Sequence, residues 1–373
     1  MKKKKVEIFG LIVNIILTIL FTLILILTFE NHIKSIPEEQ ELILLILIFI
    51  SIYITMYFQI IIHELGHLIF GLLSGYKFSS FRIGNIMLVK TGGKLKFKKL
   101  TIAGTAGQCL MTPPDLKDGK MPVILYNLGG ALLNVISCII LFIIYLFVKD
   151  NEFISVVLEL SIAYGIYFAA LNAIPMKTGT IDNDGYNALS LSLNPNAQQA
   201  FWTQLKINEL ISKGTRLKNM PDDWFYIPKP IEMKNSLIAS IAVFTCNRLM
   251  DQHYFDEANE KMKQILRAKT SIIGVHRNLL VCDRIYCELL NDNKQSAKKL
   301  MTQELKNFME SMKNFPSILR TKYAYALIVD NDLDKAQNLK KKFIEVGKTY
   351  PYQSDIRSEK ELIDIISKEQ KNK

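Results

Sequence analysis

Four long apolar runs in the first half of the chain place the strongest constraint on its fold. They cover residues 7–29, 42–73, 121–148 and 154–175 of a sequence of 373 residues. At a helical rise of about 1.5 Å per residue, each run is long enough to cross a hydrocarbon core roughly 30 Å thick. The sequence therefore predicts an all-α polytopic membrane protein with about four transmembrane helices.

The basic residues indicate how these helices are oriented. The lysine-rich start at residues 1–5, the loop from Tyr76 to Lys120 and the tail beyond Lys177 are basic, whereas residues 30–41 are acidic. By the positive-inside rule, we expect a multi-pass protein of the cell membrane with both termini cytoplasmic. The first run is too long for a signal peptide and no small-residue cleavage site follows it, so we expect an uncleaved anchor.

The net charge of +11 fits the same membrane assignment. Positive-inside bias and attraction to anionic lipid of the inner leaflet account for this charge, so the lipid bilayer is an expected partner. The sequence has no interleaving of aromatic and basic residues of the kind that binds RNA or DNA. We therefore expect no nucleic-acid partner.

A histidine-glutamate pentad, His63-Glu64-Leu65-Gly66-His67, lies inside the second apolar run. Residues four apart on an α-helix project from nearly the same face, so the two histidines can bind one Zn²⁺ while Glu64 lies next to the bound water. The alternative is a buried histidine pair satisfied by backbone carbonyls, which explains neither the glutamate nor the spacing. Ionisable residues within a membrane are functional candidates, and the pentad therefore predicts an intramembrane zinc site.

The pentad lies near the cytoplasmic end of its run. Helical rise places His63 about 18 Å from Gly75, which puts the metal inside the membrane with water reaching it from the cytosol. The next segment, Phe78 to Gly107, has alternating apolar residues on both sides of Gly92-Gly93. This pattern predicts a small β-hairpin insertion beside the active site, with a solvated basic loop as the alternative.

A third metal ligand must come from elsewhere in the chain, and two aspartates after the fourth run are candidates. This part of the chain reads Asn172-Ala173-Ile174-Pro175 and then Asp182-Asn183-Asp184-Gly185. An early pentad, a later Asn-x-x-Pro and an Asp-Gly pair together resemble the site-2 protease family of intramembrane zinc metalloproteases. The resemblance covers about residues 40 to 195.

The resemblance implies roles for individual residues. It makes His63, His67 and Asp184 the zinc ligands and Glu64 the catalytic base. Asp182 is the alternative third ligand. We prefer Asp184 because a glycine follows it.

The third run carries a further element of this family. Its residues Gly129-Gly130-Ala131-Leu132-Leu133-Asn134 are similar to a Gly-Pro-x-x-Asn element, with Ala131 in place of proline. The resemblance implies a catalytic role for Asn134, whose amide would hold substrate or the oxyanion. A single interhelical hydrogen bond is the alternative, and it applies equally to Asn127.

The function implied is that of an intramembrane zinc metalloendopeptidase. It would cleave transmembrane or membrane-associated peptides near the cytoplasmic face by means of a zinc-activated water. One alternative is a membrane zinc protease of the prenyl-protein or quality-control type, whose third ligand comes from Glu-x-x-x-Asp; the later chain offers this spacing at Glu288 to Asp292. The other is a catalytically inactive membrane-anchored scaffold or immunity protein with a vestigial pentad.

Beyond residue 195 the chain becomes polar and lysine-rich. We predict a transmembrane protease domain at 1–195, a linker at 196–230 and a cytoplasmic helical domain at 231–373. In the last of these, alanines after short polar turns recur at equal intervals of 39 residues, at Ala258, Ala297 and Ala336. This spacing predicts a tetratricopeptide-like array, with a plain helical bundle as the alternative, and either would serve as a binding module for a protein partner.

Overall fold

The computed structural model describes residues 2–35, 37–177 and 182–371. The chain divides into two compact units, which are described separately. Unit 1 combines Met1–Lys77, Ala106–Cys109 and Met121–Asn194, and unit 2 combines Phe78–Thr105, Leu110–Lys120 and Pro195–Lys373.

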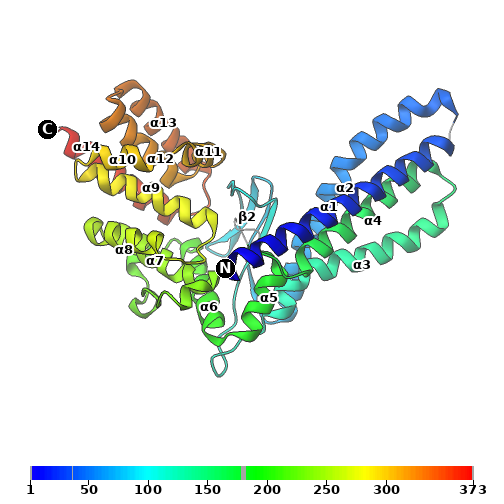
Figure 1. Cartoon of the computed structure of the whole chain (residues 1–373), viewed down its shortest axis with the longest axis horizontal. Coiled ribbons are helices and arrows are strands. Elements are labelled where there is room, and N and C mark those ends of the chain that lie inside the picture. The colour runs from blue at the N-terminus through cyan, green and yellow to red at the C-terminus, as the bar shows by residue number, and fades with distance from the viewer. Residues whose placement is uncertain (1, 36, 178–181, 372–373) are drawn as a thin grey trace. The chain divides into compact units, whose positions relative to one another are not determined.

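Unit 1 is built from four long helices, which lie side by side in Figure 1. They are α1 (Lys2–Ser35), α2 (Glu38–Leu73), α3 (Ile124–Val148) and α4 (Glu152–Ala173). Within the described residues, these four helices are long and apolar enough to cross a membrane, as the apolar runs predicted. Helix α2 packs against both α3 and α4, while α1 packs against α4. The pentad helix therefore packs against two of the other three long helices.

A short fifth helix, α5 (Asp184–Leu193), follows α4 in unit 1. Helix α4 ends at Ala173, just before Pro175, because proline disfavours a helical conformation in the residue before it. Asn183 caps the start of α5, since its side chain accepts a hydrogen bond from the backbone N–H of Tyr186. Residues 178–181 of the intervening stretch lie outside the described residues.

The predicted hairpin is part of a larger sheet. Strands β1 (Lys77–Ile83), β2 (Ile86–Thr91), β3 (Lys94–Lys99) and β4 (Gly107–Thr112) form one four-stranded sheet in the order β3-β2-β1-β4. Strands β2 and β3 pair antiparallel around Gly92 and Gly93, both of which have positive φ, as a tight turn requires. The hairpin prediction was therefore right for β2 and β3. It missed β1, which pairs antiparallel with β2 across a tight turn at residues 84–85, and β4, which lies next to β1 at the edge of the sheet.

One face of this sheet packs within unit 2 against the C-terminal helices. Met87, Val89 and Leu100 are buried with Tyr350 in one cluster, although Tyr350 lies some 250 residues further along the chain. The alternation of the strand places Met87 and Val89 on the same face, so one row of apolar side chains fills the interface.

Unit 2 is otherwise helical. Its helices are α6 (Pro195–Ser212), α7 (Ser236–Asp251), α8 (Phe255–Arg267), α9 (Gly274–Leu290), α10 (Lys294–Leu300), α11 (Gln303–Ser311), α12 (Pro316–Tyr325), α13 (Leu333–Thr349) and α14 (Gln353–Lys371). Short 3-10 helices lie at Leu217–Asn219, Asp222–Trp224 and Glu232–Lys234, and a π-helical turn, Ala326–Asp330, continues α12. The domain boundaries at 195 and 230 stay predictions.

The equally spaced alanines occupy equivalent places in three helical hairpins. They are the fourth residues of α8, α10 and α13, and all three are buried: Ala258, Ala297 and Ala336. The turn before each of these helices contains one residue with positive φ, and these residues are also 39 apart: His253, Asp292 and Asn331. The same turn geometry thus recurs with the sequence period, while the tetratricopeptide-like assignment stays a prediction.

Candidate metal centre

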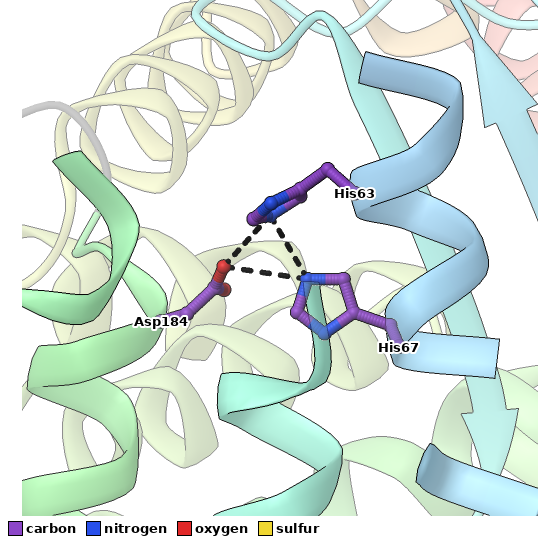
Figure 2. Close-up of side chains that lie close together, drawn as sticks. All are labelled: His63, His67 and Asp184. Atoms are coloured by element: carbon purple, nitrogen blue, oxygen red, sulfur yellow. Dashed lines mark hydrogen bonds and ion pairs between the residues drawn. The ribbon is translucent and has the colours of Figure 1, made fainter. Parts of the chain in front are cut away.

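The two pentad histidines and Asp184 meet inside unit 1, as Figure 2 shows. Asp184 Oδ2 lies 3.1 Å from His63 Nε2 and 3.3 Å from His67 Nε2, and the two Nε2 atoms are 3.2 Å apart. A tetrahedral zinc ion with bonds of about 2.0–2.1 Å separates its ligand atoms by roughly 3.3 Å. The three atoms therefore have the mutual spacing that one zinc ion requires.

The other ring nitrogen of each histidine is hydrogen-bonded to an oxygen. His63 Nδ1 lies 2.8 Å from Asn134 Oδ1, and His67 Nδ1 lies 2.8 Å from the backbone carbonyl of Tyr126. An amide or peptide oxygen only accepts, so each Nδ1 donates its proton and each Nε2 keeps a free lone pair. This is the tautomer in which a histidine binds a metal through Nε2.

Glycines allow α3 to approach the pentad closely. A Cβ atom on Gly129 would lie 2.6 Å from the carbonyl oxygen of Gly66, and one on Gly130 would lie 2.6 Å from His63 Nε2. Any other residue at these positions would push the helices apart or displace the imidazole. Close packing of α3 against the pentad helix thus explains why glycines occupy positions 129 and 130.

Glu64 is buried and lies against the start of β4. A Cβ atom on Gly107, the first residue of this strand, would overlap the carboxylate oxygen Oε1 of Glu64. The hydroxyl of Tyr126 donates to the carbonyl of Cys109, which ties the strand to α3. The same Tyr126 holds His67 through its backbone carbonyl, so one residue connects the strand, the third helix and a candidate ligand.

Asp184 is positioned by its neighbour Asn183. The side-chain oxygen of Asn183 accepts from the backbone N–H groups of Tyr186 and Met176, both at 2.9 Å. Its side-chain nitrogen donates to the carbonyls of Leu171 and Ile174, at 2.7 and 2.6 Å. These four bonds fasten the start of α5 to the end of α4, and with them the carboxylate that follows.

The rival aspartate has a different neighbour. Asp182 Oδ2 lies 4.0 Å from Lys177 Nζ, and the backbones of these two residues form an isolated β-bridge. Asp184 instead faces the histidines. Its Oδ2 lies within 3.3 Å of both Nε2 atoms, and a carboxylate oxygen is a common zinc ligand.

The predicted site residues have distinct surroundings. The structure brings His63, His67 and Asp184 together, and both polar side-chain atoms of Asn134 contact protein groups. The side chain of Asn127 donates to the carbonyl of Val123, one turn earlier, instead of crossing to another helix.

Sequence reasoning missed several residues that shape the site, among them Tyr126, Asn183 and Gly107. Asn183 carried a detectable signal, because asparagine before a helix is a common N-cap. Gly107 carried none, since its importance comes from a strand reaching Glu64 across 43 residues.

A small side chain at position 107 provides a test of this geometry. Gly107→Ala should lower peptide cleavage by roughly 100-fold, the cost of a displacement of about 1 Å in a catalytic group. Zinc binding should be unchanged, because Glu64 is not among the three candidate ligands. Cleavage rates and zinc content measured on the same preparations check this, and full activity in the variant would contradict it.

Comparison with known proteins gives one match. The family model described as Peptidase family M50 matches residues 51–321, which contain the pentad, Asn134 and Asp184. No curated protein and no solved structure matches the chain.

Proposed function

Because this chain belongs to peptidase family M50, the site-2 protease family, we propose that it is an intramembrane zinc metalloendopeptidase. Members of this family are zinc metalloproteases, and the four apolar helices indicate a multi-pass membrane protein. The observation that carries the proposal is the meeting of His63, His67 and Asp184, whose ligand atoms are 3.1 to 3.3 Å apart.

We assign zinc binding to these three residues and leave the fourth position for water, as catalytic zinc sites do. Zinc held there supplies Lewis acidity, which makes a water molecule more acidic and polarises a peptide carbonyl. Glu64 takes a proton from the attacking water and returns it to the leaving amine as the peptide bond breaks. Because Gly107 has no side chain, the carboxylate of Glu64 fits beside it. Asn134 and the backbone carbonyl of Tyr126 orient the two imidazoles with Nε2 toward Asp184.

The proposed substrate is a transmembrane or membrane-associated peptide. The carbonyls of a transmembrane helix are hydrogen-bonded within that helix, so the substrate must unwind locally before water can attack. We therefore expect helix-breaking residues near the cleaved bond. Purified protein with one zinc per chain that cleaves such a peptide would support the proposal, and protein that binds no zinc would refute it.

The surroundings of Glu288 argue against the prenyl-protein type of protease. Glu288 accepts hydrogen bonds from Asn259 and Asn293, at 3.0 and 2.7 Å. Its carboxylate thus has a structural role in the C-terminal helices. An inactive scaffold with a vestigial pentad remains the second candidate, and zinc stoichiometry separates it from the enzymes.

We also propose that both termini are cytoplasmic and that the site opens to the cytosol, on the strength of the basic and acidic loops. Glu38 and Lys96 are both exposed and lie on opposite sides of the pentad along the chain. Glu38→Cys should react with a membrane-impermeant thiol reagent in intact cells, and Lys96→Cys should react only after the cells are opened. The native cysteines are buried, which keeps the background low. The reverse pattern would place the site on the outer face.

The C-terminal helices are proposed to bind a protein partner or the substrate. Helical repeats stack into extended surfaces that bind partners, and three hairpins of this chain share one spacing and one turn geometry. Nucleic acid is not proposed as a partner, since the positive charge has an explanation in the membrane orientation.

A further inference from the structure

A buried amide, Gln59, lies one helical turn before His63 on α2. Its side chain is fully buried, together with that of Asn134, among the apolar helices of unit 1. An amide in such a position is costly unless every polar atom is satisfied. The hydrogen-bond partners of Gln59 therefore indicate its role.

The orientation of Gln59 is fixed by the backbone of α4. Its nitrogen Nε2 lies 2.9 Å from the carbonyl oxygen of Ser161. A peptide carbonyl only accepts, so the nitrogen must face Ser161 and the oxygen Oε1 must face the other way. Gly165 gives the amide room, because a Cβ there would lie 3.0 Å from Nε2.

The oxygen of Gln59 in turn orients Asn134 on α3. Asn134 Nδ2 donates to Gln59 Oε1 at 2.8 Å and to the backbone carbonyl of Gln59 at 3.0 Å. With its nitrogen held there, Asn134 can present only its oxygen to His63 Nδ1, at 2.8 Å. The proton of His63 is thereby kept on Nδ1 and the lone pair on Nε2.

We propose that Gln59 is a positioning residue for the metal centre, which sets the tautomer of His63 through Asn134. This chain of hydrogen bonds begins at the backbone carbonyl of Ser161, an acceptor that cannot flip, and ends at His63, whose Nε2 faces Asp184. We call the hydrogen bonds from Ser161 through Gln59 and Asn134 to His63 the relay. His67 needs no relay, because the backbone carbonyl of Tyr126 accepts from it directly. The proposal rests on the proposed zinc site, and it makes Asn134 a positioning residue in place of the substrate-binding role that the resemblance implied.

The test compares zinc affinity among purified full-length variants, measured by competition with a chelator. Gln59→Met keeps the shape of the side chain but leaves Asn134 Nδ2 with one of its two acceptors, the backbone carbonyl of residue 59, so zinc affinity should fall by roughly 10-fold. Gln59→Glu should restore near-native affinity, because a buried carboxyl group is neutral and offers one donor to Ser161 and one acceptor to Asn134.

Two further variants separate the relay from general packing. Asn134→Leu should weaken zinc binding at least as much as Gln59→Met, and the double variant should be no weaker than Asn134→Leu alone, because both act through one path. Ser137→Ala is the matched control: it removes the 3.2 Å bond to Gln59 Oε1 without breaking the relay, and affinity should hardly change.

The outcomes distinguish the relay from the function on which it rests. Native zinc affinity in Gln59→Met, or losses that add in the double variant, would overturn the relay while leaving the zinc site intact. Equal losses in Gln59→Met and Gln59→Glu would also overturn it, since a side chain that supplies both a donor and an acceptor would then do no better than one that supplies neither. Absence of zinc binding in the native protein would instead refute the proposed function. Thermal unfolding without metal checks that each variant is folded.

Discussion

Glu64→Gln should abolish most proteolysis while leaving zinc bound. The amide has the size of the carboxylate but cannot accept the proton of the attacking water, and loss of a general base typically costs about 10²- to 10⁴-fold in rate. The candidate ligands His63, His67 and Asp184, whose metal-facing atoms lie 3.1 to 3.3 Å apart, are all kept in this variant.

The measurement compares membrane peptides in cells that carry the native protein with those in cells that carry the variant. Peptides that persist only with Glu64→Gln identify the substrates. Zinc content of the two purified proteins serves as the control. Cleavage at the native rate by the variant would rule out Glu64 as the base and would also disfavour the mechanism proposed above.

Asp184→Ala should remove both zinc and activity. It deletes one of three protein ligands, so the loss of zinc affinity should exceed the roughly 100-fold that is typical of a second-shell partner. The matched variant is Asp182→Ala, which removes a neighbouring carboxylate that lies 4.0 Å from Lys177 Nζ. Because one carboxylate completes a three-ligand site, Asp182→Ala should retain its zinc.

Metal analysis of the two purified aspartate variants decides between them. Zinc retained by Asp184→Ala and lost from Asp182→Ala would transfer the ligand role to Asp182. Loss from both would indicate that the stretch between α4 and α5 must be intact for either carboxylate to reach the histidines.

The membrane helices and the pentad were predictable from local sequence. Spans follow from the length of apolar runs, and the shared face of His63 and His67 follows from the helical period, which involves only four residues. The hairpin of β2 and β3 was also a local feature, marked by Gly92 and Gly93. Strand β4 was missed because it joins the sheet next to β1 through pairing that no local pattern encodes.

What the sequence determined by itself is therefore the membrane class, the pentad helix and the types of the candidate metal ligands, all of which depend on short-range periodicity and composition. Tertiary structure alone decided which carboxylate faces the histidines, since Asp184 reaches His63 across 121 residues. It also decided that Gly107 borders Glu64 and that Asn134 contacts His63 and Gln59. These contacts arise where separate helices and a strand pack together, and the packing depends on the summed shapes of many side chains, which no single motif contains.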